Sequence, residues 1–281
     1  MVHPVGVHTQ QVVRRPAVAG YFYPADPAGL REQVEACGGD GSLRTPATSV
    51  VVPHGSYRQC GAVLGQTLSR VVIPPCCVIV GPSHTGAWMR WSVMERGAYR
   101  TPLGEVPIDE PCAAALRMRC PFLLADAGSQ RGEHAIEVIL PFLQRWGPVD
   151  LRVVPVVIGS TDAEEVSLFA RALAQVARMR EAPTLLIASS DLSHYEPQQR
   201  AVAQDEALLE AILALDGAAL LRRIEERALL MCGMWAVVAV LEAARALGAT
   251  QGSLVRYGTS AEAGGDPEAV IGYAGVILSG E

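Results

Sequence analysis

The stretch TLLIASSDLSHY (Thr184–Tyr195) decides the fold class. It begins as a short apolar run, which is typical of a buried strand, and it ends in a cluster of serine, aspartate, histidine and tyrosine side chains. The loops at the carboxyl ends of parallel strands converge on one crevice, so a strand that runs straight into polar residues is typical of an α/β active site.

Two other stretches repeat this pattern. They are SVVVPHGSY (Ser49–Tyr57) and CCVIVGPSHTG (Cys76–Gly86), and in each an apolar run is followed within a few residues by a histidine. A further apolar run, Leu151–Ile158, is also predicted to be a strand, with Pro155 demoting part of it to an edge or a bulge. These runs predict a mostly parallel sheet.

Segments with helical spacing of apolar residues alternate with the strands. The predicted helices are Pro27–Cys37, Gly61–Val71, Asp109 to about Met118, Glu133–Gln144 with a kink at Pro141, Asp162 to about Met179, Ala201–Leu213, Gly217–Glu226 and Gly233–Leu247. Trp91–Tyr99 is predicted to be an edge strand, and Ser253–Tyr257 and Val270–Leu278 two closing strands. The expected fold is a single α/β domain over residues 14–281, with a central mixed, mostly parallel sheet flanked by helices, after a loose tail over residues 1–13.

Arg14–Pro24 (RRPAVAGYFYP) combines two arginines, a glycine and three aromatic residues. One interpretation is an arm that packs across the domain. The other is a binding loop in which Arg15 or Tyr21 faces a substrate. We favour the packing interpretation.

The composition excludes several kinds of function. The chain has 281 residues, half of them hydrophobic, which is enough for a large core. All of its basic side chains are arginine, so a Schiff-base lysine and a P-loop lysine are excluded. The net charge of −6 argues against a nucleic-acid binder. Because no uncharged apolar run reaches about 18 residues, we expect no membrane span.

The cysteine pattern indicates a reducing compartment. There are seven cysteines, an odd number, and no CxxC pair, so neither a disulfide framework nor a zinc ribbon is expected. The N-terminus also lacks the charged and apolar regions of a signal peptide, and we therefore expect a cytoplasmic protein.

Four of the six histidines occur in chemically suggestive places: His54, His84, His134 and His194. A lone histidine is usually a hydrogen-bonded structural residue. Three histidines that follow strands, however, are brought together at one edge of a parallel sheet, and imidazole is the commonest protein ligand for metals near neutral pH. Two histidines and one anionic ligand with open positions are typical of non-haem Fe(II) oxygenases.

The candidates for the anionic ligand are Asp191, Glu133 and Cys232. Cys232 lies at the predicted start of a helix, where the helix dipole would lower the pKa of its thiol and favour thiolate. The alternative, a small buried core residue, is equally compatible with the pattern.

Other chemistries have weaker support. A serine hydrolase with a GxSxG elbow, a GxGxxG dinucleotide site and an HExxH metalloprotease lack their motifs. Zinc hydrolysis with two histidines and a carboxylate stays open.

Several segments in order resemble one family. They are RRPAVAGYFYP, VVPHGSY, IVGPSHTG, YRTPLGEVPID, EHAIEVILPFLQ, VVPVVIG, IASSDLSHY, MCG and the closing RYGTS and VIGYAGVIL. Over about Arg14 to Leu278 this pattern resembles the Memo family, known in prokaryotes as AmmeMemoRadiSam system protein B. That family is similar in turn to the catalytic subunits of class III extradiol ring-cleaving dioxygenases.

The resemblance implies roles for individual residues. His54, His84 and Cys232 match positions that bind iron or copper, and Asp191 and His194 match an acid/base pair. His134 is expected to line the same pocket and to take part in catalysis. The polar residues beside these positions are expected to contact the substrate: Tyr57, Ser83, Glu133, Ser190 and Tyr195. One departure is the sequence PHGSY in place of PHAGY, which is expected to alter the loop that carries His54.

These observations leave three hypotheses. The first is a non-haem enzyme of dioxygenase or redox type, with Fe(II) as the expected metal, copper or zinc as alternatives, and a small molecule or a peptide as its substrate. The second is a non-catalytic metal-binding or adaptor protein that acts with radical-SAM and Ammecr-type proteins. The third is a zinc hydrolase.

Overall fold

The computed structural model describes residues 12–39, 43–86 and 90–280. Its helices are α1 (Pro27–Cys37), α2 (Tyr57–Leu68), α3 (Glu110–Arg119), α4 (Leu140–Trp146), α5 (Ala163–Met179), α6 (Gln198–Leu213), α7 (Gly217–Arg227) and α8 (Met234–Ala246), with short 3-10 turns η1 (Glu137–Ile139) and η2 (Ser260–Ala263). Its strands are β1 (Val13–Arg14), β2 (Ser49–Val52), β3 (Cys76–Pro82), β4 (Trp91–Val93), β5 (Ala98–Thr101), β6 (Gly104–Pro107), β7 (Leu124–Ala125), β8 (Arg152–Ile158), β9 (Thr184–Ser189), β10 (His194–Glu196), β11 (Gln251–Thr259) and β12 (Val270–Ser279).

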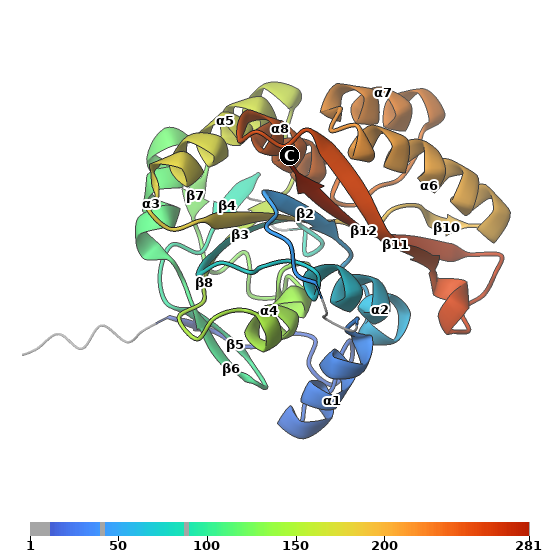
Figure 1. Cartoon of the computed structure of the whole chain (residues 1–281), viewed down its shortest axis with the longest axis horizontal. Coiled ribbons are helices and arrows are strands. Elements are labelled where there is room, and N and C mark those ends of the chain that lie inside the picture. The colour runs from blue at the N-terminus through green and yellow to red at the C-terminus, as the bar shows by residue number, and fades with distance from the viewer. Residues whose placement is uncertain (1–11, 40–42, 87–89, 281) are drawn as a thin grey trace, which may run out of the picture.

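The predicted fold class is confirmed. Within the described ranges the main sheet has the order β10-β12-β2-β9-β3-β8-β4-β7, with β11 added beside β12. Strands β2, β9, β3 and β8 run parallel, while β12 and β4 flank them antiparallel. Helices α5 and α8 lie on one side of this sheet and α2 and α4 on the other (Figure 1).

The four central strands are buried along almost their whole length, which explains their continuous apolar sequences. β2 and β3 are buried at every residue, and β9 at every residue but the first. Parallel strands covered by helices on both faces lack the alternating pattern of half-exposed strands. The short apolar runs were therefore sufficient to locate these strands.

Several helices begin where a capping residue indicates. The side chain of Asp162 accepts hydrogen bonds from the backbone N–H groups of Glu164 and Glu165 at the start of α5, and Asp109 caps α3 in the same way. The predicted helix at Glu133–Gln144 is wrong in its first half, because Glu133–Ile136 is not helical. Pro141 does not kink a helix either. It lies in the first turn of α4, where its missing N–H costs nothing.

Strand β8 lies between β3 and β4, and the expected edge position of Pro155 is confirmed for that part of the strand. Pro155 is in register with Ile79 of β3, and pairing with β4 begins only at Val156. The carbonyl of Pro155 accepts a hydrogen bond from Gln130 Nε2 at 3.2 Å. On the side away from β3, the backbone of Pro155 therefore meets a side chain rather than a paired strand, and its missing N–H breaks no sheet hydrogen bond.

The N-terminal segment packs across the domain, as the favoured interpretation predicts. Most of the expected loose tail lies outside the described residues, but Val13 pairs with Ala98 in a small sheet of β1, β5 and β6. Arg14 is buried and forms an ion pair with Glu137, whose carboxylate also accepts a hydrogen bond from the hydroxyl of Tyr23.

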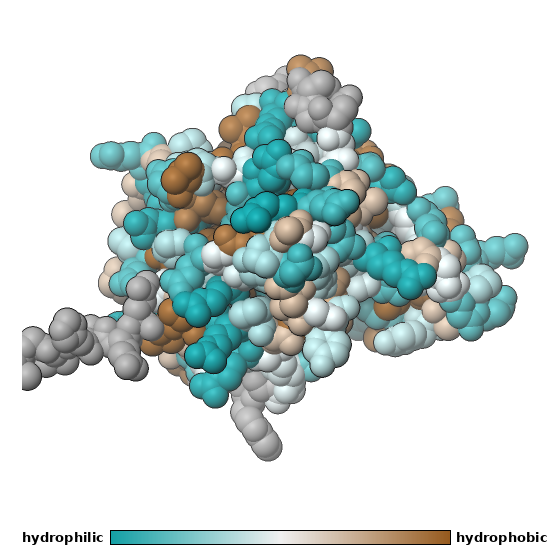
Figure 2. Space-filling view, turned by 90° about the horizontal axis from the view of Figure 1, so that it is seen from below, coloured by the Kyte–Doolittle hydropathy of each residue, from teal (hydrophilic) through white to brown (hydrophobic). Residues whose placement is uncertain are grey.

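Hydrophobic residues are scattered among hydrophilic ones on the face seen in Figure 2. Among the helices that the structure describes, none has the length and apolar character needed to cross a bilayer.

Candidate metal centre

Three neighbouring strands deliver polar side chains to one edge of the sheet. Strands β2, β9 and β3 are adjacent, and their carboxyl ends are level, because Val52 pairs with Ser189 and Val80 with Ala188. The chain continues from these ends into His54, Asp191 and His84. The expectation that the strand-end side chains meet is therefore confirmed.

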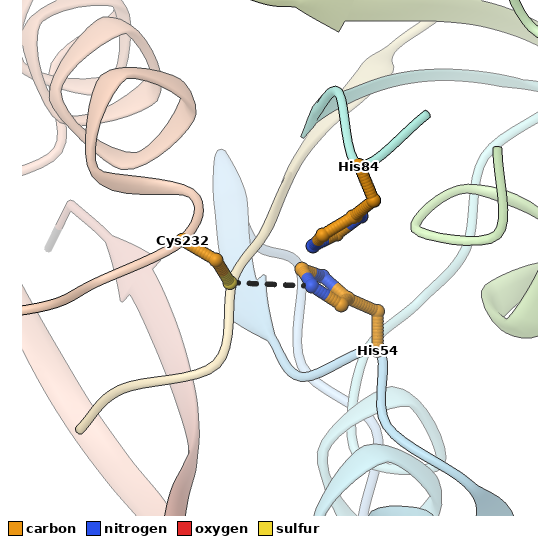
Figure 3. Close-up of side chains that lie close together, drawn as sticks. All are labelled: His54, His84 and Cys232. Atoms are coloured by element: carbon orange, nitrogen blue, oxygen red, sulfur yellow. Dashed lines mark hydrogen bonds between the residues drawn. The ribbon is translucent and has the colours of Figure 1, made fainter. Parts of the chain in front are cut away.

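The fourth contribution comes from the turn that precedes α8. This helix packs on β9 and β3, and so places Cys232 beside the strand ends. The ring nitrogens of His54 and His84 and the Sγ of Cys232 all lie within 4.8 Å of one another. Figure 3 shows the rings of His54 and His84 next to each other, with the sulfur of Cys232 opposite them. Sγ of Cys232 is 3.2 Å from Nε2 of His54.

A serine fixes the tautomer of His54. Ser189 Oγ donates its single proton to the carbonyl of Ala135 at 2.6 Å, so it accepts from Nδ1–H of His54 at 2.8 Å. Nε2 of His54 therefore carries a free lone pair and points at Cys232. This is the arrangement in which a metal-binding imidazole is usually held.

A buried carboxylate fixes the tautomer of His84. Glu133 Oε1 lies 2.9 Å from Nδ1 of His84, and Glu133 Oε2 accepts the backbone N–H of the same residue. Nδ1 is consequently the protonated nitrogen, and Nε2 is left free for a metal. The backbone N–H groups of His134 and Ala135 also donate to Glu133 Oε1.

The charges of this cluster follow from burial and from Glu133. Burial lowers the pKa of His54 well below its usual value, and the neighbouring His84 and His134 lower it further. Burial opposes the charged form of His84, but the hydrogen bond with Glu133 and the negative charges of Glu133 and Asp191 together outweigh it, and the pKa of His84 is raised. Burial alone would raise the pKa of Glu133, yet its hydrogen bonds with His84 and the backbone hold it at about 2. Glu133 is thus a permanent anion behind His84.

The expected depression of the Cys232 pKa is wrong for the metal-free protein. Burial raises the pKa of this thiol to about 12, and the nearby Asp191 carboxylate acts in the same direction. A hydrogen bond from the backbone N–H of Asp191 at 3.2 Å opposes the rise without overcoming it. The thiol is therefore protonated at neutral pH, and only a bound cation would convert it into a thiolate.

The expected pairing of Asp191 with His194 is replaced by two separate contacts. Asp191 Oδ1 accepts the backbone N–H of His54 at 2.8 Å, so this carboxylate positions the loop that carries His54. Nδ1–H of His194 donates to the carbonyl of Leu192 at 2.8 Å. His194 thus also presents a free Nε2, but a backbone carbonyl orients it rather than Asp191.

The histidines open onto a cavity of about 420 Å³. The ring of His134 stacks on His84, with centroids 4.5 Å apart, and meets Phe22 edge-on. Burial and the nearby His84 lower the pKa of His134, which favours a neutral ring. The lining residues are Tyr21, Phe22, His54, Gly55, Ser56, Gln59, His84, His134, Asp191, His194, Tyr195, Ile271 and Tyr273.

Of the residues expected to contact a substrate, the structure brings only Tyr195 to this cavity. Glu133 lies behind His84. Tyr57 is buried and donates to the carbonyl of Val138 at 2.6 Å. Ser190 is buried and accepts the backbone N–H of Gly233 at 3.0 Å, which holds the turn of Cys232. The hydroxyl of Ser83 is buried without a partner in the described part of the chain.

The sequence did not indicate several residues that shape the site. Gln59, Ile271 and Tyr273 line the cavity although no role was predicted for them, and Ile271 and Tyr273 belong to the closing VIGYAGVIL segment. Tyr21 also lines the cavity. Its position agrees with the less favoured interpretation, in which the N-terminal segment is a binding loop. The role of Ser189 could have been suspected from its place just before Asp191, although its partners could not.

Comparisons with known proteins agree on the family. The profile of the Memo-like protein family matches residues 14–277. A MEMO1 family protein of Methanopyrus kandleri is 39% identical over 278 residues, which cover 94% of this chain and 98% of that protein. A MEMO1 family protein of Methanothermobacter thermautotrophicus is 37% identical over 275 residues, with 94% and 99% covered.

A solved structure shares the fold. An uncharacterized protein from Escherichia coli K12 superposes with a TM-score of 0.51 at 16% identity, over 81% of this chain and 98% of that one. The identity is too low to carry more than the fold. The family profile and the full-length relatives carry the assignment: the chain belongs to the Memo-like protein family.

Proposed function

We propose that the protein binds one transition-metal ion through His54, His84 and Cys232 and uses it in a dioxygenase-type or other redox reaction. The observation that supports the proposal most directly is the convergence of these three donors within 4.8 Å. Both rings also have Nδ1 engaged and Nε2 free. Such a set has the donor types and the orientation that a metal requires.

The donor types limit the choice of metal. Two imidazoles and one thiolate leave coordination positions open for further ligands. We propose Fe(II) as the native ion, and copper as the alternative because thiolate is a softer ligand than carboxylate. When bound, either ion would supply redox chemistry and a place for oxygen or substrate.

The residues around the cavity suggest how protons would be handled. Nε2 of His194 is free, so this ring is the proposed general base for a substrate hydroxyl. His134 is held neutral beside His84, and we propose that it binds a polar atom of the substrate. Phe22, Tyr195 and Tyr273 provide apolar walls that limit access of water to a bound molecule.

The first experiment is metal analysis of the protein purified without added metal, followed by anaerobic loading with Fe(II). We expect one bound iron in the wild type and oxygen uptake with a reducing substrate such as a catechol. His54→Ala and His84→Ala should lose the metal. His134→Ala, a matched histidine in the same cavity, should keep it.

Two outcomes would contradict the proposal. Unaltered metal binding in His54→Ala would refute the ligand set. Zinc at full occupancy together with hydrolytic turnover would refute the redox assignment, although the ligand set would stand.

A further inference from the structure

Cys232 belongs to two overlapping sets of metal-binding atoms. Besides the set with His54 and His84, the sulfur also lies within 4.8 Å of donor atoms of Asp191 and His194. We propose that Asp191, His194 and Cys232 form a second metal site, with the Cys232 thiolate shared between two ions. The inference rests on the proposed function, because the shared thiolate is also a ligand of the first site.

Asp191 and His194 each have a free donor atom beside the shared sulfur. Nδ1–H of His194 is engaged by the carbonyl of Leu192, so Nε2 is the ring nitrogen that is left for a metal. Oδ1 of Asp191 accepts the backbone N–H of His54, whereas Oδ2 receives no hydrogen bond from any described residue. Nε2 of His54 lies 4.0 Å from Oδ2, but it carries no proton in the tautomer that Ser189 imposes. Oδ2 of this nearly buried carboxylate therefore lacks a cationic or donor partner.

A third group of ligand-type residues in the same cavity fails this test. His84, Glu133 and His134 also lie within 4.8 Å. However, Nδ1 of His84 is already engaged by Glu133, and its Nε2 belongs to the first site. Oε1 of Glu133 accepts three N–H groups, so a metal there would have to break existing hydrogen bonds. The set with Asp191 and His194 therefore keeps donor atoms for a second ion, whereas the set with Glu133 does not.

The donor types indicate which ion the second site would take. One carboxylate oxygen, one imidazole and one thiolate are ligands that Zn(II) accepts with an open fourth position. Co(II) is a suitable probe, because it takes the same ligands and reports thiolate binding by a charge-transfer band. A second ion would also occupy Nε2 of His194 and thereby remove this base from proton transfer.

The test is an anaerobic titration of the metal-free protein with Co(II), followed by native mass spectrometry and absorption. We expect two equivalents in the wild type. His194→Ala and Asp191→Asn should each retain one equivalent and weaken the second by more than about 100-fold, since loss of outer hydrogen bonds alone costs 10–100-fold. His134→Ala lies in the same cavity outside both sets, and it should bind two.

The outcomes separate this inference from the proposed function. A single equivalent in the wild type, or two equivalents in both His194→Ala and Asp191→Asn, would overturn the second site and leave the first intact. Binding of no metal at all would overturn both. Asp191→Asn preserves the acceptor for the backbone N–H of His54, and thermal unfolding of each variant identifies any loss that is due to misfolding.

Discussion

Cys232 Sγ lies 3.2 Å from Nε2 of His54, although 178 residues separate the two in the chain. The contact exists because β2 and β9 are neighbours and because Ser190 holds the turn before α8 against the end of β9. We expect this contact and the hydrogen bonds around it to control metal binding and stability.

Replacing Ser189 with alanine should weaken metal binding by about 10–100-fold. The substitution frees Nδ1 of His54 and allows the tautomer in which Nε2 carries the proton. Affinity measured by competition with a chromophoric chelator would detect this change. Ser56→Ala is the control, because Ser56 also lines the cavity and its hydroxyl donates to the exposed side chain of Gln59. An equal effect in both variants would refute the role of Ser189.

Glu133 should contribute stability that is lost in acid. Its folded pKa is depressed to about 2, so the contribution is fully present above its usual pKa and disappears as the pH falls through about 2. The difference between the usual and the folded pKa of Glu133 corresponds to about 3 kcal/mol in the free energy of unfolding. Urea unfolding between pH 5 and pH 2.5 should show a steeper loss of stability in the wild type than in Glu133→Gln. If the free energy of unfolding fell equally with pH in both proteins, the depressed pKa of Glu133 would be contradicted.

Metal affinity should increase with pH because the Cys232 thiol must lose its proton. Its pKa is raised to about 12 without metal, so over pH 7.5–9 the affinity should rise about tenfold per pH unit. Isothermal titration in buffers of different ionisation enthalpy would measure one released proton. An affinity that does not vary with pH would show that Cys232 is not a ligand.

Arg14→Ala should destabilise the protein by about 3–5 kcal/mol, because it leaves the buried carboxylate of Glu137 without its cation. The exposed pair of Arg100 and Glu105 provides a matched control, and Arg100→Ala should cost less than about 1 kcal/mol. Chemical denaturation would compare the two. Similar losses would mean that the buried pair does not anchor the N-terminal segment.

Asp205→Asn should loosen the turn that carries His194. The buried carboxylate of Asp205 accepts the backbone N–H and the hydroxyl of Ser193, at 2.9 and 3.0 Å, and the hydroxyl of Tyr257 at 2.7 Å. We expect the free energy of unfolding to fall by about 1–3 kcal/mol, and backbone amide hydrogen exchange at residues 192–195 to become faster. Tyr257→Phe removes only one of these bonds, and an equal increase of exchange in that variant would contradict the role assigned to Asp205.

Much of the fold follows from local sequence. The buried parallel strands have unbroken apolar runs, and Asp109 and Asp162 mark the starts of their helices through their capping hydrogen bonds. The predicted helix at Glu133–Gln144 failed in its first half because Glu133 uses its carboxylate on His84 and on two backbone N–H groups. Such tertiary contacts override helical spacing and leave no trace in the spacing itself.

The sequence by itself determined the fold class, the family and the donor types of the site, because each depends on local patterns and on the order of short motifs. Only the tertiary structure decided which donors face one another and in which tautomer. In the structure Glu133 contacts His84, and Ser189 contacts His54. Tyr57 and Ser190 form buried hydrogen bonds and do not line the cavity, and burial keeps the thiol of Cys232 protonated. These properties depend on burial and on partners far apart in the chain, and the level ends of β2, β9 and β3 bring those partners together.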